Sequence, residues 1–175
     1  MERSSLIKRQ LIVNGKIVDF YKGLFSEQGV WQPLLDGLDL LALEEVDSKC
    51  LEKCFTEDEV YEAGSNMSGD KAVGLDGFMM ALFQICWGVV KVDLIMVFHH
   101  FHEHYTLEKS FNATFVSLIP KKPGAAKIKD FLPISLIAGV YKILAKVLAK
   151  RLKLVLRKVV SVPQNAFVSK RQILD

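Results

Sequence analysis

Cysteine is scarce in this 175-residue chain, and its three cysteines follow neither a disulfide nor a zinc-binding pattern. Cys50 and Cys54 are one helical turn apart, but no second cysteine pair accompanies them to complete a four-ligand zinc site. An odd number of cysteines without a CxxC pair is typical of a reduced protein. We therefore expect an intracellular protein of the nucleus or cytoplasm, with no disulfide framework and no metal site.

Long apolar runs are also missing. The longest nearly apolar stretch, residues 78–90, includes Gln84 and is shorter than the roughly 20 residues that cross a bilayer. The first five residues are polar and are followed by Lys8 and Arg9, so no hydrophobic core of a secretory signal is present. The sequence predicts neither secretion nor a membrane span.

Acidic residues are nearly absent from the last third of the chain. Residues 121–175 contain 13 of the 23 basic residues and two of the 20 acidic ones, a net charge of +11. The first 120 residues contain the other 10 basic and 18 acidic residues, a net charge of −8. This division indicates a polyanion-binding half joined to an acidic half. A solvated basic surface without a partner is the alternative.

The N-terminal half contains helical signals separated by a glycine-rich loop. Aromatic and leucine spacing favours a helix over 18–25, although Asn14-Gly15 is also a hairpin signal. Thr56 and Glu59 have the spacing of a capping box, which predicts a helix beginning beside them. Residues 65–77 contain three glycines and predict a loop, with Asp76 as a turn residue. One or two apolar helices follow, whose expected core aromatics are Phe78, Phe83, Trp87, Phe98 and Phe101.

The C-terminal half combines strand signals with one long helix, which predicts an α+β fold. Residues 111–119 are β-branched and aromatic, and residues 130–136 are extended around a proline, so a β-hairpin is expected over 111–136. Its tip contains the Pro-Lys-Lys-Pro-Gly turn at 120–124. A helix over about 140–160 is the clearest element. We predict for it an apolar stripe of Leu144, Leu148, Leu152, Val155 and Val159 and a basic stripe of Lys142, Lys146, Lys150, Lys153 and Arg157.

Five sequence blocks follow one another across residues 71–175. The first is KAVGLDGF at 71–78, which is similar to a KAPGPDG-type motif. The others are NATFVSLIPKK, DFLPISL, YKILAKVLA, and QNAFV with RQILD, at 112–122, 130–136, 141–149, 164–168 and 171–175. This series resembles the reverse transcriptases of non-long-terminal-repeat (LINE-type) retrotransposons, most closely those of plants. The resemblance implies a truncated reverse-transcriptase domain over 71–175, with fingers and the start of the palm, after a linker-like segment over 1–70.

The resemblance also implies partners and binding residues. In that family the fingers hairpin folds over the incoming deoxynucleotide, so Lys121 and Lys122 are expected to bind its triphosphate, whose dense negative charge they can neutralise. Gln164, Phe167 and Arg171 belong to the blocks expected to bind the template. The expected partners of intact relatives are an RNA or DNA template-primer and deoxynucleotides, with magnesium as the cofactor.

Three positions depart from the family pattern. Leu132 stands where the family has an arginine that contacts the triphosphate, and an aliphatic side chain cannot replace that bidentate fork. Val73 and Leu75 replace two prolines and loosen the loop that they restrict. These departures predict a degenerate sequence.

The chain contains no Asp-Asp pair, whereas polymerases hold two divalent metals with carboxylates. In the resembled family the metal-binding aspartates follow the last block, and Asp175 belongs to the RQILD block. We therefore expect a fragment of an RNA-directed DNA polymerase that is inactive alone, with no catalytic residue, metal or cofactor of its own. The alternatives are a non-catalytic nucleic-acid-binding module and a helix at 141–160 that lies on anionic membranes.

Four histidines, at positions 99, 100, 102 and 104, have the appearance of a metal cluster. His100 and His104 are one helical turn apart, but no further suitably placed ligand accompanies them. Solvated histidines at a helix end are the favoured interpretation. Because fingers pack against a palm in the resembled family, we also expect exposed apolar surface, marginal stability and aggregation.

Overall fold

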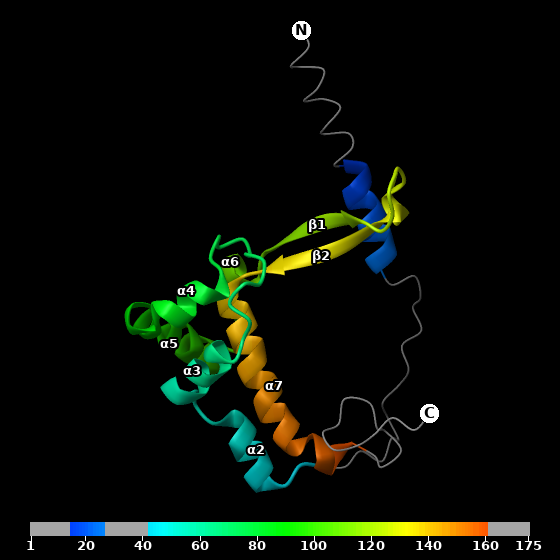
Figure 1. Ribbon diagram of the computed structural model, residues 1–175. Coiled ribbons are helices and arrows are strands. Elements are labelled where there is room, and N and C mark those ends of the chain that lie inside the picture. Colours follow the sequence, from blue (N-terminus) through cyan, green and yellow to red (C-terminus); the bar gives the residue numbers. More distant parts are fainter. Residues whose placement is uncertain (1–14, 27–41, 161–175) are drawn as a thin grey trace. The chain divides into compact units, whose positions relative to one another are not determined.

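The described residues belong to two compact units, a smaller one with residues 15–26 and 118–133 and a larger one with residues 42–117 and 134–160. The structure, a computed structural model, describes residues 15–26 and 42–160 (Figure 1). These residues are mostly helical and include one two-stranded sheet, so the predicted α+β class is confirmed. The helices and strands are α2 (Glu45–Glu52), α3 (Glu57–Ser65), α4 (Met80–Ile85), α5 (Trp87–His104), α6 (Lys109–Asn112), β1 (Thr114–Pro120), β2 (Phe131–Ile137) and α7 (Gly139–Val159).

The smaller unit contains a helical segment and the outer half of the hairpin. Residues 15–25 are helical, which confirms a helix in preference to a hairpin at this position. Strands β1 and β2 pair with each other, and the Lys121 N–H donates to the Asp130 carbonyl at 2.9 Å where the pairing ends. The tip between the strands includes a short 3-10 helix, Ile128–Asp130.

The hairpin begins later than the sequence predicts. Residues 109–112 form the short helix α6, and β1 starts only at Thr114, so the strand predicted from residue 111 is wrong over its first residues. The side chain of Phe111 packs against the core of the larger unit. Its burial from a helical turn outweighs the β-propensity of the local sequence.

Helix α3 begins as its capping box predicts. Thr56 Oγ1 accepts a hydrogen bond from the Glu59 N–H at 3.3 Å, and Glu59 Oε2 accepts one from the Thr56 N–H at 3.2 Å. Val60 and Ala63 are buried on one face of the helix. They pack in the core of the larger unit with Ile143 of α7, so the local cap positions a helix whose stability comes mainly from this packing.

The predicted apolar region after the glycine-rich loop forms two helices, α4 and α5 (Figure 1). Phe83 and Phe98 are buried as expected, and Trp87 and Phe101 pack partly buried against the core. Phe78 is half exposed, so its predicted core position is wrong. Phe78 precedes α4 in the loop, where no helix face directs it inward. The core consists of Phe55, Val60, Ala63, Met80, Phe83, Leu94, Phe98, Val140, Ile143, Leu144 and Val147.

Helix α7 occupies nearly the predicted residues but buries a different face. Of the predicted apolar stripe, Leu144 and Val155 are buried, Val159 is partly exposed, and Leu148 and Leu152 are exposed. The core face is therefore rotated away from the leucine-rich stripe. It consists of Gly139, Val140, Ile143, Leu144, Val147, Arg151 and Val155.

Candidate nucleic-acid interface

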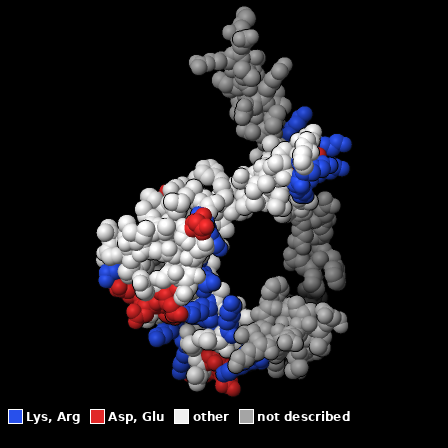
Figure 2. All heavy atoms as spheres, in the orientation of Figure 1, with Lys and Arg blue, Asp and Glu red and all other residues white. Residues whose placement is uncertain are grey.

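The hairpin tip carries a group of exposed lysines, which Figure 2 shows as a basic cluster at the end of the hairpin. The Lys121 ammonium donates to the Lys129 carbonyl at 3.1 Å, and Lys122 lies 3.4 Å from the Asp130 carboxylate. The Lys127 N–H donates to the same carboxylate at 3.1 Å and is the main reason why the pKa of Asp130 is lowered. The tip therefore has four exposed lysines, at 121, 122, 127 and 129, and one acid, so it can attract an anion such as phosphate.

Leu132 lies in β2 and is half exposed. Its side chain adds neither a charge nor a hydrogen-bond donor to the outer part of the hairpin. Lysine offers a point charge, whereas arginine offers two parallel donors to a phosphate. The tip can therefore neutralise a phosphate through its lysines, but residue 132 gives it no bidentate hold.

The KAVGLDGF loop packs against the start of α7. Asp76 Oδ2 accepts a hydrogen bond from the Gly139 N–H at 2.8 Å, and its Oδ1 accepts one from the Phe78 N–H at 3.3 Å. A Cβ atom on Gly74 would lie 2.4 Å from the Ile137 carbonyl oxygen, so only glycine allows this approach. Asp76 is therefore the predicted turn residue and also an acceptor at the N-terminus of α7, where the helix dipole favours a carboxylate.

Arg151 is a buried cation that sequence patterns did not indicate. Its side chain is about 6 % exposed and forms two hydrogen bonds with the Glu59 carboxylate, at 3.1 and 2.8 Å. It also donates to the carbonyls of Leu51, Lys53 and Cys54. The Arg151 contact is the largest cause of the lowered pKa of Glu59. The available sequence signal was that Arg151, although charged, has the helical spacing of the α7 residues that face the core.

The basic stripe of α7 lies on the outside of the helix, as its spacing predicts. Lys146, Lys150 and Lys153 are exposed, and Lys142 is partly exposed. The Lys142 ammonium donates to the Ala72 carbonyl at 3.0 Å, and Lys150 forms an ion pair with Glu62 of α3. The stripe thus places several ammonium groups along one solvent-facing side of the larger unit.

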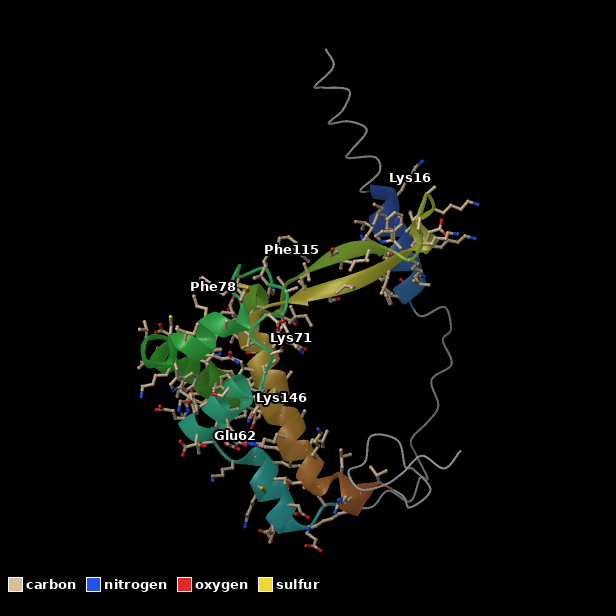
Figure 3. The ribbon with its side chains drawn as sticks, in the orientation of Figure 1. Lys16, Glu62, Lys71, Phe78, Phe115 and Lys146 are labelled. Atoms are coloured by element: carbon tan, nitrogen blue, oxygen red, sulfur yellow. The ribbon has the colours of Figure 1, made fainter. Side chains whose placement is uncertain are left out.

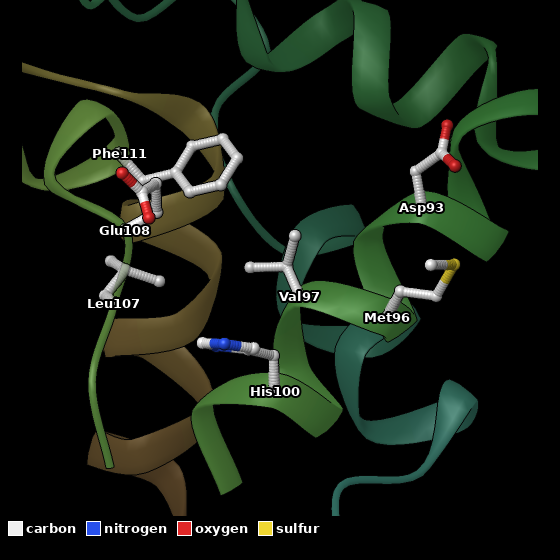
Figure 4. A pocket seen from close by; sticks show the side chains of 7 residues that line it. All are labelled: Asp93, Met96, Val97, His100, Leu107, Glu108 and Phe111. Carbon is white, nitrogen blue, oxygen red and sulfur yellow. The ribbon is translucent and has the colours of Figure 1, made fainter. Parts of the chain in front are cut away.

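Two adjoining apolar cavities lie beside α5. The first, about 350 Å³, includes His100, Met96 and Glu108 in its lining (Figure 4). The second, about 280 Å³, shares Asp93, Val97 and Phe111 with it. Their linings are mainly apolar and contain no basic residue other than His100, so they offer no cationic group of fixed charge to a phosphate.

The histidines of α5 make contacts within the fold. His102 Nε2 is 2.8 Å from the Glu52 carbonyl oxygen, and the rings of His100 and His104 stack with centroids 4.3 Å apart. Over residues 15–26 and 42–160, no group of three or more histidine, cysteine, aspartate or glutamate side chains could hold a metal ion. His99, His100 and His104 are exposed, as expected for histidines near a helix end, and His102 is partly buried.

The three expected template-binding residues, Gln164, Phe167 and Arg171, lie outside the described residues. In the described part of the chain, no helix combines the length and the apolar character that crossing a membrane requires.

The comparison with known proteins points to mobile genetic elements. No protein-family model matches the chain. The uncharacterized 149 kDa protein of transposon TX1, from Xenopus laevis, is 34 % identical to it over 160 residues. This match covers 89 % of the chain and 12 % of the Xenopus protein, so the chain spans about an eighth of that relative's length. The chain is thus similar, over most of its length, to one segment of a transposon protein.

Proposed function

We propose that the chain is a fragment of the RNA-directed DNA polymerase of a non-long-terminal-repeat retrotransposon and comprises its fingers and the start of its palm. The observation that carries the proposal is the ordered series of family-like blocks over 71–175, within a chain that is similar to a transposon protein over 160 residues. The basic hairpin tip adds support, because the family resemblance implies nucleotide binding there.

In this proposal Lys121 and Lys122 contact the triphosphate of the incoming nucleotide. In the free protein their ammonium groups are bonded to the Lys129 carbonyl and the Asp130 carboxylate, and both side chains are exposed enough to exchange these contacts for phosphate oxygens. Leu132 provides no guanidinium, so nucleotide binding is weak. Gln164, Phe167 and Arg171 are the proposed template contacts.

We propose no polymerisation by the chain as given, because it contains no Asp-Asp pair to hold the two metals of the reaction. Primer extension on an RNA template with magnesium tests this directly. If the primer is still extended after contaminating polymerases have been removed, the proposed inactivity is wrong. Absence of product is the expected result.

The nucleotide-binding assignment has a separate test in Leu132→Arg. A charge-assisted hydrogen bond contributes about 1.5–3 kcal/mol, so the arginine should tighten binding of a magnesium deoxynucleotide by about tenfold or more. Leu132→Met is the control and should bind as the unchanged chain does. Equal affinities in the arginine and methionine variants, measured by equilibrium dialysis, would refute nucleotide binding at the hairpin.

A second candidate function is a non-catalytic nucleic-acid-binding module. The observation that favours it is the +11 charge of residues 121–175, part of which lies in the basic stripe of α7. Such binding weakens linearly in log–log plots as salt rises, with a slope set by the number of neutralised phosphates. A protein that binds neither RNA nor DNA at low salt would exclude this module.

A further inference from the structure

A small hollow lies where the basic stripe of α7 meets the end of α3. Its volume is about 120 Å³, compared with the roughly 30 Å³ that one water molecule occupies in the liquid, so it has room for a group of several heavy atoms. The small side chains of Ala63 and Ala149 leave the space open. Its lining consists of Glu62, Ala63, Asn66, Lys146, Ala149, Lys150 and Lys153.

The hollow has an excess of positive charge. Three lysines and one glutamate line it, and the glutamate, Glu62, forms its ion pair with Lys150. Within the described parts of the chain, Lys146 and Lys153 form no ion pair. Figure 3 shows Glu62 on α3 next to Lys146 on α7. Two lysines without an ion pair therefore line the same small space.

The shape of the hollow favours a polynucleotide over a membrane surface. A concave site between two helices admits a protruding phosphodiester, whereas a flat layer of lipid headgroups would meet its rim. Glu62, which lines the hollow, would be pressed against an extended anionic surface but need not meet a narrow strand. The remaining lysine of the stripe, Lys142, continues the row along α7 toward the KAVGLDGF loop.

We propose that this hollow binds a phosphate of a polynucleotide backbone, with Lys146 and Lys153 as the binding cations and Glu62 as an internal competitor that lowers the affinity. The inference rests on the proposed association of the chain with nucleic acid and adds a site that is separate in sequence from the hairpin tip. Lys150 is held by Glu62 in the free protein and becomes available when phosphate displaces the carboxylate.

The test is fluorescence anisotropy of a labelled single-stranded 20-nucleotide RNA and its DNA equivalent across a salt series. The double variant Lys146→Gln/Lys153→Gln should bind about five- to tenfold more weakly, and its log–log salt slope should be smaller in magnitude by about 0.7, the value for one lost phosphate contact on a single strand. Glu62→Gln should bind about threefold more tightly. Lys49→Gln, which removes one positive charge from α2, should bind within twofold of the unchanged chain.

A measurement on the unchanged chain guards against variants that fail to fold. Amine acetylation followed by mass spectrometry should show Lys146 and Lys153 protected by the oligonucleotide and Lys49 unprotected. If the chain binds oligonucleotide but the double variant and the protection pattern match the Lys49 control, the hollow is refuted and the proposed nucleic-acid association stands. If no oligonucleotide binds at low salt, that association and the hollow both fail. If the chain binds phosphatidylserine vesicles but no oligonucleotide, the basic stripe of α7 binds lipid headgroups and the proposal is wrong.

Discussion

At the scale of single residues, Arg151 connects segments that are far apart in the sequence. Its guanidinium donates to Glu59 about 90 positions earlier and to carbonyls at the end of α2 and in the segment that joins it to α3. It also lies 4.4 Å above the ring of Phe55. The guanidinium has five N–H donors in one plane, which suit this set of oxygens. These hydrogen bonds matter because a buried charge is tolerated only when it is paired and fully hydrogen-bonded.

Removal of this guanidinium should destabilise the larger unit. Arg151→Ala leaves Glu59 without its partner and leaves the carbonyls of the α2–α3 segment without their donor, and we expect a loss of about 2–3 kcal/mol in the free energy of unfolding. The estimate is below that for a fully buried pair because Glu59 is partly exposed. Urea denaturation measures the loss. Lys150→Ala breaks an exposed ion pair instead and should cost less than about 1 kcal/mol; equal losses in the two variants would contradict the role of Arg151.

The same contact makes stability depend on pH. Arg151 holds the pKa of Glu59 below its usual range, so the contact stabilises the fold fully above the unfolded-state pKa of about 4.3 and is lost as pH falls through the lowered folded-state pKa. Glu59→Gln lacks this titration. The unchanged chain should therefore be more stable than Glu59→Gln at pH 6, and the difference should narrow as pH falls below about 4. Urea midpoints that differ by the same amount at pH 6 and pH 3 would contradict the linkage.

At the scale of helices and strands, features that depend on neighbouring residues could be predicted from the sequence, whereas features that depend on distant residues could not. The Thr56–Glu59 capping box involves four adjacent positions, and the structure confirms it. The length of α7 was also predictable, but its core face was not, because the position of Arg151 became favourable only through the distant Glu59. A helix with apolar residues on two sides does not by itself reveal which side meets the core.

The basic stripe was predictable, whereas the hollow at its centre was not. Lysine spacing alone places the stripe on one side of α7. The hollow requires α3 to pack across that helix with alanines at positions 63 and 149, which only the tertiary structure reveals. The contribution of Glu62 depends on the same packing, so no local pattern identifies the acid that competes for Lys150.

The attachment of the KAVGLDGF loop to α7 gives a prediction for a whole element. Asp76→Ala removes the acceptor of the Gly139 N–H and a negative charge from the positive end of α7, which should cost about 1–2 kcal/mol. Urea denaturation and faster hydrogen exchange at the Gly139 amide measure the effect. Asp70→Ala removes an exposed acid whose hydrogen-bond partner is the nearby Ser68, and it should change stability much less than Asp76→Ala does. A Gly139 amide that exchanges equally fast in both variants would show that Asp76 does not hold the helix start.

At the scale of the whole molecule, apolar side chains remain exposed on several elements. Ile85 and Val89, near the junction of α4 and α5, are 83 % and 79 % exposed, and Val92 and Met96 continue the same side of α5 at helical spacing. Separate exposed apolar residues are normal on protein surfaces, but a row on one helix face presents a continuous patch to other molecules. Burial of this patch against another chain is favourable, so it promotes association. Because these side chains are already exposed in the folded chain, they add little to the free energy that opposes partial unfolding.

We therefore expect reversible self-association and a broad, low-temperature melt for the purified chain. Val89→Lys with Met96→Lys places two charges in the α5 row and should shift the sedimentation coefficient toward that of a 19.7 kDa monomer at protein concentrations of about 10–100 μM. Lysine at two exposed positions off the row, Thr106 and Ser110, adds the same charge and should leave association largely unchanged. Equal loss of association in both double variants would show that net charge, and not the α5 row, controls it. A monomeric unchanged chain with a sharp two-state melt would refute both the association and the marginal stability.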